Sequence, residues 1–421
     1  MKKSIHASGV NGTVIAPASK SAAQRAIIAA TLARGTSILN HLTPCDDTLA
    51  ATGIARALGA TVDITGEQCR VTSGFPPPPA KERQLSCGES GLLARVIIPV
   101  AALLPGTTRV NGRGTLLQRP FDMLVAPLRE LGANITTSAS RLPVTLSGPV
   151  TGGVATIDGS ISSQLLTGLL LALPLAGKDS TLHVNNLKSK PYVDLTIDLL
   201  DTFGIRVEHR DYRLFLVPGR QTYRPATRNI EGDWSGASCM IVAGCIAGVA
   251  PGGVTVSNLD PRSAQADKAI LEVARRTGAR VIVNQDGNVS ASPGEHARAF
   301  DFDASESPDL FPAIVALAAC CEGTSRVTGA TRLLHKESNR ALVLQQEYGK
   351  LGIDIRVEGD VMSITGGEIH GGNVSSRDDH RVAMSLATAA LRATGTVTID
   401  AAESVSKSYP GFWDDLARLQ E

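Results

Sequence analysis

Six stretches of the chain are apolar on almost every side when they are drawn as helices. They are residues 22–33, 92–104, 165–176, 237–250, 310–321 and 382–393. A helix without a broad polar face is normally buried in a protein core. The pattern therefore predicts six buried helices, with the more polar parts of the chain arranged around them.

A second pattern recurs between these helices, in phrases such as ALGATVDI and KLGIDIRV. In each phrase a helical stretch ends at a glycine, and a segment of alternating apolar and polar residues follows. The glycine stands where a helix C-terminus favours positive φ, and the alternation predicts a strand. The glycines are Gly59, Gly132, Gly204, Gly278 and Gly352, so successive copies lie 73, 72, 74 and 74 residues apart. Spacing this regular indicates duplicated units.

A short strand-like segment also follows each apolar helix, which raises the number of units to six. These segments are residues 36–42, 107–114, 180–187, 253–260, 324–331 and 395–402. The sixth unit stops before its hairpin. Two N-terminal strand-like segments, residues 4–8 and 12–17, are expected to complete it.

The expected fold class is α/β, with two similar domains of three repeated units each, because 421 residues exceed the usual size of one core. In each domain, buried parallel helices should be surrounded by sheets, as in an inside-out α/β barrel. The N-terminal domain should span residues 19–228. The C-terminal domain should combine residues 1–18 with 229–421, so that the N-terminal strands close it.

Composition and charge narrow the class of partner. A net charge of +1 offers no overall attraction to nucleic acid or to an anionic membrane. The seven cysteines contain no C-x-x-C pair and lie mostly in apolar segments, which is typical of reduced thiols rather than of a metal site. No P-loop, H-E-x-x-H or complete G-x-G-x-x-G motif is present. We therefore expect a cytoplasmic protein with small-molecule ligands and without a cofactor, metal, nucleic-acid or membrane partner.

The starts of the six apolar helices are rich in serine, glycine and charged residues. Parallel buried helices would bring their N-termini to one end of each domain, where the helix dipoles favour anions. Each start taken alone could be an ordinary N-cap. That alternative does not explain why several chemically versatile side chains fall at such starts: Lys20, Arg25, Gln164, Asp309, His380 and Arg381.

Several motifs, in this order along the chain, resemble the 3-phosphoshikimate 1-carboxyvinyltransferase, or EPSP synthase, family. They are SKSAAQR, LQRPFDMLVAPLRELGA, SISSQLLTGLLLALPLA, KSKPYVDLTIDLL, SPDLF, HKESNR, DDHRVAM and SKSYPGFWDDL. The resemblance implies two domains with the active site in the cleft between them. It also implies transfer of the enolpyruvyl group of phosphoenolpyruvate to the 5-hydroxyl of shikimate 3-phosphate, in aromatic amino-acid biosynthesis. The sequence offers no obvious dimer patch, so we expect a monomer.

The resemblance also implies roles for individual residues. Shikimate 3-phosphate would be bound by Lys20, Ser21, Arg25, Ser162, Ser163, Gln164, Ser189, Tyr192, Asp309 and Lys336. Phosphoenolpyruvate would be bound by Lys20, Gly91, Arg119, Gln164, Arg340, Arg381 and Lys407. For catalysis we expect Asp309 beside the attacking hydroxyl, Glu337 beside the vinyl methylene, Lys20 bridging both substrates and His380 on the phosphoenolpyruvate side. Structural ion pairs or helix caps are expected for Arg95, Asp47 and Asp379.

Two residues depart from the family pattern. Glu89 and Arg332 each stand where well-known members have asparagine. A carboxylate at Glu89 should repel phosphoenolpyruvate unless Arg95 or another cation pairs with it. Because of these departures the sequence does not predict whether the protein is sensitive to glyphosate. They do not change the predicted class of reaction.

Two other functions remain as alternatives at this stage. The enolpyruvyl transferase that acts on UDP-N-acetylglucosamine shares the architecture, but usually has a cysteine in the loop that reads NGRGTLLQRP here. A non-catalytic anion-binding repeat protein could use the same helix starts. It would have no need for Asp309 and Glu337 beside the cations.

Overall fold

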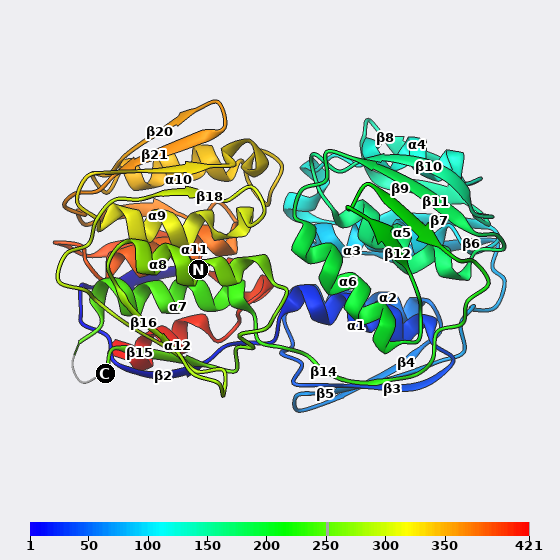
Figure 1. Ribbon diagram of the computed structural model, residues 1–421, viewed down its shortest axis with the longest axis horizontal. Coiled ribbons are helices and arrows are strands. Elements are labelled where there is room, and N and C mark those ends of the chain that lie inside the picture. Colours follow the sequence, from blue (N-terminus) through cyan, green and yellow to red (C-terminus); the bar gives the residue numbers. More distant parts are fainter. Residues whose placement is uncertain (250–251, 421) are drawn as a thin grey trace. The chain divides into compact units, whose positions relative to one another are not determined.

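The chain divides into two compact units in the computed structural model, which describes residues 1–249 and 252–420 (Figure 1). Unit 1 comprises Met1–Ser19 and Glu231–Glu421, and unit 2 comprises Lys20–Ile230. The boundaries expected from the sequence, after residues 18 and 228, lie one and two residues earlier. The last residue of the helix predicted at 237–250 and the last residue of the predicted C-terminal domain lie outside the described residues.

Unit 2 contains three repeats built around a buried helix. The first consists of α1 (Lys20–Leu32), β3 (Gly35–Asn40), α2 (Asp46–Ala57), β4 (Thr61–Thr65), β5 (Gln68–Ser73) and the distant strand β14 (Thr227–Asn229). The second consists of β6 (Glu82–Ser86), α3 (Gly91–Ala101), β7 (Thr107–Asn111), the 3-10 helices η1 (Gly114–Gln118) and η2 (Asp122–Leu124), α4 (Val125–Glu130), β8 (Asn134–Ser138) and β9 (Arg141–Ser147). The third consists of β10 (Gly153–Asp158), α5 (Gln164–Ala172), η3 (Leu173–Leu175), β11 (Ser180–Asn185), α6 (Lys190–Thr202), β12 (Glu208–Arg210) and β13 (Leu214–Val217).

Unit 1 contains three further repeats of the same kind. The fourth consists of β2 (Gly12–Ile15), α7 (Trp234–Ala247), β15 (Val254–Ser257), η4 (Ala266–Ala269), α8 (Ile270–Arg276), β16 (Arg280–Val283) and β17 (Val289–Ser292). The fifth consists of β18 (Asp301–Asp303), η5 (Pro308–Leu310), α9 (Phe311–Ala319), β19 (Thr324–Thr328), η6 (Ala330–Leu333), α10 (Arg340–Gly349), β20 (Asp354–Glu358) and β21 (Val361–Thr365). The sixth consists of β22 (Gly372–Ser375), α11 (His380–Ala390), β23 (Val397–Asp400), η7 (Ala402–Lys407), α12 (Phe412–Gln420) and β1 (Lys2–Ile5).

One strand order recurs in the sheets. In the second repeat β6 runs parallel to β7, and β9 and β8 follow as an antiparallel hairpin. The third and fifth repeats have the same order, β10-β11-β13-β12 and β18-β19-β21-β20. The parallel pair requires a crossover connection, and the buried helix supplies it.

The N-terminal segment is shared between two repeats. Strand β1 pairs antiparallel with β23 and so takes the hairpin position in the sixth repeat. The sequence led us to expect β2 in the sixth repeat as well. That expectation is wrong, because β2 runs parallel to β15 in the fourth repeat. In unit 2 the chain closes in a similar way, because β14 returns to pair in parallel with β3.

The predicted inside-out arrangement is confirmed. Every residue of α3, α7, α9 and α11 is buried, and the three central helices of unit 1 contact one another. The sheets lie outside these helices (Figure 1). The five regularly spaced glycines all have positive φ, between 76° at Gly204 and 99° at Gly132, as the helix-end pattern predicts. Across residues 1–249 and 252–420, none of the helices combines the length and apolar character needed to cross a bilayer.

Candidate active site

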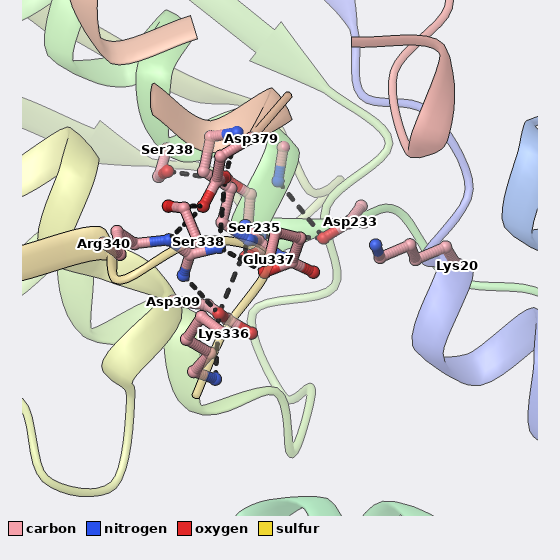
Figure 2. A network of polar contacts seen from close by, with 12 residues as sticks. Lys20, Asp233, Ser235, Ser238, Asp309, Lys336, Glu337, Ser338, Arg340 and Asp379 are labelled. Carbon is pink, nitrogen blue, oxygen red and sulfur yellow. Dashed lines mark hydrogen bonds and ion pairs between the residues drawn. The ribbon is translucent and has the colours of Figure 1, made fainter. Parts of the chain in front are cut away.

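Arg340 is the centre of a charged cluster in unit 1 (Figure 2). It is the first residue of α10, and its side chain has no exposed surface. Its guanidinium donates to Asp379 at 2.9 and 3.2 Å, to Asp309 at 2.9 Å and to Glu337 at 2.7 Å. Burial alone would lower the pKa of Arg340, but the three carboxylates outweigh it and raise that pKa above its ordinary value. The guanidinium is therefore a permanent cation that organises three acidic side chains.

Asp309 lies in η5, and one of its carboxylate oxygens is close to three cationic side chains. Its Oδ1 is 3.1 Å from Lys336 Nζ, 2.9 Å from Arg340 Nη1 and 3.5 Å from Arg381 Nε. Burial alone would raise the pKa of Asp309, but Arg381, Lys336 and Arg340 hold it well below its usual range. One quarter of the side chain is exposed. The carboxylate is therefore ionised at neutral pH and remains accessible to a ligand.

Lys336 and Glu337 precede α10 and are also partly exposed, at 22% and 16% of their side chains. Burial lowers the pKa of Lys336. Asp309 and Glu337 oppose that shift, whereas the positive charges of Arg340 and Arg332 add to it. Lys336 has a lowered pKa, Glu337 is bonded to Arg340, and both lie near the ionised Asp309. Groups of this kind are suited to proton transfer.

Arg332, one of the two departures from the family pattern, supplies part of this positive field. Its Nη1 donates to the carbonyl oxygen of Ser305 at 2.6 Å. Burial lowers the pKa of Arg332, while Glu306, Asp309 and Asp360 act in the opposite direction. The departure therefore adds a cation to the surroundings of Asp309.

Replacing Arg332 by asparagine should raise the pKa of Lys336, because removing a neighbouring positive charge favours the protonated amine. The rate at which acetic anhydride labels Lys336, measured by mass spectrometry over a series of pH values, should then rise only at higher pH than in the unchanged protein. Arg356→Asn, at an exposed position of the same unit, is the control. An onset at the same or lower pH would contradict this electrostatic coupling.

The start of α11 joins this cluster to α7. Asp379 is fully buried, caps α11 by accepting from the Arg381 N–H at 3.0 Å, and accepts from Ser338 as well as from Arg340. Asp379 therefore serves both as a helix cap and as an ion-pair partner, the two structural roles considered for it from the sequence. Arg381 Nη1 donates to the hydroxyl of Ser235. Sequence analysis had not singled out either serine.

The other residues near the start of α11 behave differently from one another. His380 is fully buried in the first turn, so direct contact with a substrate would require its ring to become accessible. Lys407, also buried, donates from Nζ to the carbonyl oxygen of Asp378 at 2.8 Å. Arg377 instead pairs at 3.3 Å with Glu347, a fully buried carboxylate of α10 that sequence analysis missed. Nothing in the sequence sets Glu347 apart, because α10 also contains two glutamines.

Unit 2 carries the remaining candidates, beginning at α1. Lys20 is the first residue of α1, and its Nζ lies 3.0 Å from Asp47 Oδ2, which confirms the structural ion pair expected for Asp47. Arg25, also buried, donates to the hydroxyl of Thr196 at 3.0 Å and to the carbonyl oxygen of Ser21 at 2.8 Å. Its guanidinium lies 6.0 Å from the centre of the Tyr192 ring, and burial lowers its pKa to about 10.

The starts of α5 and α6 bring together hydroxyl groups and an amide. Ser162 accepts from the Gln164 N–H at 3.1 Å, and Ser163 is buried at the N-cap of α5. Gln164 Oε1 in turn accepts from Arg95 at 2.8 Å, so Arg95 ties α3 to α5. Ser189 precedes α6 with a φ of 57°, and Tyr192 lies in the first turn of that helix.

Gly91 begins α3 and lies against Arg119. A Cβ atom at Gly91 would overlap Arg119 Nη1, so any larger residue would require the Arg119 side chain to move. From the sequence, this glycine is expected to give a ligand close access to the backbone. The structure gives a second reason, which is that the glycine makes room for a buried arginine.

The candidates therefore form two sets, one in each unit. Unit 1 holds Asp309, Lys336, Glu337, Arg340, His380, Arg381 and Lys407, and unit 2 holds Lys20, Ser21, Arg25, Gly91, Arg119, Ser162, Ser163, Gln164, Ser189 and Tyr192. Cations and hydroxyl groups suit phosphate and carboxylate groups, and the carboxylates suit proton transfer. The substrate assigned to each residue stays a prediction.

Comparison with known proteins identifies the family. Residues 6–416 match the family model for EPSP synthase (3-phosphoshikimate 1-carboxyvinyltransferase). The chain is 38% identical over 425 residues to a 3-phosphoshikimate 1-carboxyvinyltransferase from Methanosarcina acetivorans, covering 100% of this chain and 98% of that protein. It is 35% identical over 414 residues to one from Clostridium perfringens, covering 98% and 96%.

Solved structures agree with this result. EPSP synthase from Acinetobacter baumannii matches with a TM-score of 0.82 and 25% identity, over 100% of this chain and 98% of that one. The enolpyruvyl transferase NikO from Streptomyces tendae matches with a TM-score of 0.79 and 21% identity, over 99% and 96%, a likeness of fold alone. Together with the two sets of helix-start residues, the full-length matches show that this chain is a transferase of the EPSP synthase (3-phosphoshikimate 1-carboxyvinyltransferase) family.

Proposed function

We propose that the chain transfers the enolpyruvyl group of phosphoenolpyruvate to the 5-hydroxyl of shikimate 3-phosphate and releases inorganic phosphate. The observation that carries the proposal is the accessible, ionised carboxylate of Asp309 among three cations, with Glu337 beside them. The reaction needs an acceptor for the hydroxyl proton and cations for two polyanionic substrates. The proton acceptor and part of the positive charge lie within one cluster of unit 1.

The free protein already pairs its cations internally, so substrate anions have to compete for them. The two substrates together carry roughly five to six negative charges, counting each phosphate as about −1.5 to −2. In unit 1, Lys336, Arg340 and Arg381 are bonded to acidic side chains or to a serine. A substrate phosphate that draws Lys336 away from Asp309 would raise the pKa of that carboxylate. Substrate binding would thus make Asp309 a stronger base when it is needed.

The proton transfers follow from this assignment. Asp309 accepts the hydroxyl proton as the oxygen attacks C2 of phosphoenolpyruvate, and Glu337 supplies a proton to the methylene carbon C3. The assignments reverse when the tetrahedral intermediate breaks down. The bond between C2 and the phosphate oxygen breaks, Asp309 gives its proton to the leaving phosphate, and C3 returns a proton to Glu337 as the double bond forms again. Lys20 stabilises the developing charge, and His380 acts on the phosphoenolpyruvate side without direct contact in its buried position.

The residue assignments by substrate complete the proposal. Shikimate 3-phosphate is held by Lys20, Ser21, Arg25, Ser162, Ser163, Gln164, Ser189, Tyr192, Asp309 and Lys336. Phosphoenolpyruvate is held by Lys20, Gly91, Arg119, Gln164, Arg340, Arg381 and Lys407. We also propose a cytoplasmic location, because the seven cysteines are free thiols, as is usual in that compartment. We propose a monomer because the sequence offers no obvious dimer patch.

Phosphate release from phosphoenolpyruvate tests the function directly. The purified protein should release phosphate when shikimate 3-phosphate is the acceptor, and not when UDP-N-acetylglucosamine is supplied instead. Mass spectrometry should find an acceptor product heavier by one enolpyruvyl group. Release that depends on the sugar nucleotide, or binding without release, would restore one of the alternatives that the family comparison does not favour.

A further inference from the structure

Glu89 is hydrogen-bonded through its side chain to the loop segment that follows β7, at Thr115. It stands two residues before α3, and its Oε2 accepts from the Thr115 N–H at 3.3 Å and from the Thr115 hydroxyl at 3.2 Å. The carboxylate also lies against Gly114, where an added Cβ atom would overlap it. Gly114 has a φ of 56°, a conformation that glycine adopts without strain. The first two residues of η1, Gly114 and Thr115, are therefore packed directly against this carboxylate.

The same loop leads directly to Arg119. The 3-10 helix η1 spans Gly114–Gln118, and Arg119 follows it, with its N–H bonded to the Leu116 carbonyl oxygen at 3.1 Å. At the other end of the loop, the Arg113 N–H donates to the Gly88 carbonyl oxygen at 2.8 Å. The segment before α3 thus holds the loop through both the Gly88 backbone and the Glu89 side chain.

We infer that Glu89 is a positioning residue, which holds η1 against the start of α3 and thereby sets the place of Arg119 beside Gly91. This inference rests on the proposed function in one respect, the assignment of Arg119 to phosphoenolpyruvate. It reverses the expectation from the sequence that the carboxylate mainly repels that substrate. In the structure the carboxylate accepts two hydrogen bonds from Thr115, and bonds to an ionised acceptor are stronger than those between neutral groups.

The two interpretations of Glu89 predict opposite changes in substrate affinity. If the carboxylate positions Arg119, Glu89→Ala should raise the KM for phosphoenolpyruvate by about tenfold, which corresponds to about 1.4 kcal/mol. The kcat and the KM for shikimate 3-phosphate should stay within about twofold, since Arg119 is not assigned to that substrate. If the carboxylate mainly repels the substrate, Glu89→Ala should lower the KM for phosphoenolpyruvate.

Three further variants separate the parts of the interaction. Glu89→Gln keeps an acceptor oxygen and the side-chain length, so it should recover part of the affinity lost in Glu89→Ala. Thr115→Val removes the hydroxyl donor but keeps the backbone N–H, so it should cause a smaller loss. In the double variant Glu89→Ala with Thr115→Val, the two losses should not add, because both remove the same contact. Glu130→Ala is the control, because Glu130 is another carboxylate of unit 2 that accepts a hydrogen bond from a backbone N–H, that of Thr156 in β10.

Hydrogen exchange provides a readout that does not depend on catalysis. In the substrate-free protein, a peptide covering residues 112–119 should exchange faster in Glu89→Ala than in the unchanged protein, with little change in α5 or α6. The control Glu130→Ala should leave that peptide unaffected. This comparison can be made even if the unchanged protein releases no phosphate, so the failure of the proposed function is distinguishable from the failure of this inference.

Three results would overturn the inference. One is a lower KM for phosphoenolpyruvate in Glu89→Ala, and another is an equal rise in the KM of both substrates. The third is unchanged exchange across residues 112–119.

Discussion

Replacing Asp309 by alanine or asparagine is expected to lower kcat at least about 100-fold, the usual minimum effect of removing a group that transfers a proton. Asparagine is the sharper change, since it keeps the size of the side chain but removes its charge and its ability to accept a proton. The loss should persist with both substrates saturating. Steady-state phosphate release measures it, and the same assay should show a comparable loss for Glu337→Ala.

The effect has to be separated from a loss of structure. Asp309 compensates Lys336, Arg340 and Arg381, so the variant leaves three cations with less negative charge around them. Both tryptophans of the chain, Trp234 and Trp413, lie in unit 1, so their fluorescence reports whether that unit stays folded. Asp354→Asn, at an exposed ion pair, is the matched control. A folded Asp309→Asn protein that turns over within a few-fold of the unchanged protein would remove Asp309 from the mechanism.

Replacing Arg340 by methionine is expected to destabilise unit 1 by about 3–5 kcal/mol, the range observed when one partner of a buried ion pair is removed. Methionine preserves much of the volume but leaves Asp379 fully buried without the guanidinium that bonds to both of its oxygens. Urea unfolding followed by tryptophan fluorescence should show the transition of unit 1 at lower urea concentration. Arg356→Met, which breaks an exposed pair, should cost less than about 1 kcal/mol.

A second change should reverse part of this loss. Adding Asp379→Asn to Arg340→Met removes the uncompensated buried charge, and asparagine can still cap α11. The double variant should therefore be more stable than Arg340→Met alone. If the double variant is instead less stable by the sum of the single effects, the two residues do not act as a pair.

Local features of the sequence predicted much of the fold. The buried helices were recognisable because residues such as those of α7 are apolar on all sides, which leaves no face for water. The spaced glycines were recognisable because Gly59 and its counterparts end helices with positive φ. Each of these properties depends on the residue and its near neighbours. For that reason, the buried helices and the hairpins that follow them could be placed from the sequence.

Pairing over long distances could not be predicted in the same way. The alternating residues of β2 indicate a strand, but nothing in them selects β15 rather than β23 as its partner. Strand choice depends on how whole repeats pack, not on the local pattern.

The candidate site shows the same limit. Its residue types and positions at helix starts were recognisable. The arrangement in which Arg340 bonds to Asp309 and Asp379 was not, because Asp309 is 31 residues away in the same repeat and Asp379 lies in the next repeat. Glu347 pairs with Lys350, three residues further on, and with Arg377 in the next repeat, and local sequence cannot reveal the second partner. Glu89 looked like an unfavourable charge because its bonds to Thr115 connect two loops that the sequence does not relate.

The pairing of β1 with β23 has a consequence for how the chain folds as it leaves the ribosome. Lys2 lies opposite Asp400, so β1 cannot form this pairing until the chain has been made as far as Asp400. At about 5–20 residues per second, it waits roughly 20–80 s. Unit 2 consists of one continuous segment and can form during that time. Unit 1 can be completed only when β1 and β23, which lie near opposite ends of the chain, meet, so its assembly follows the synthesis of all of unit 2.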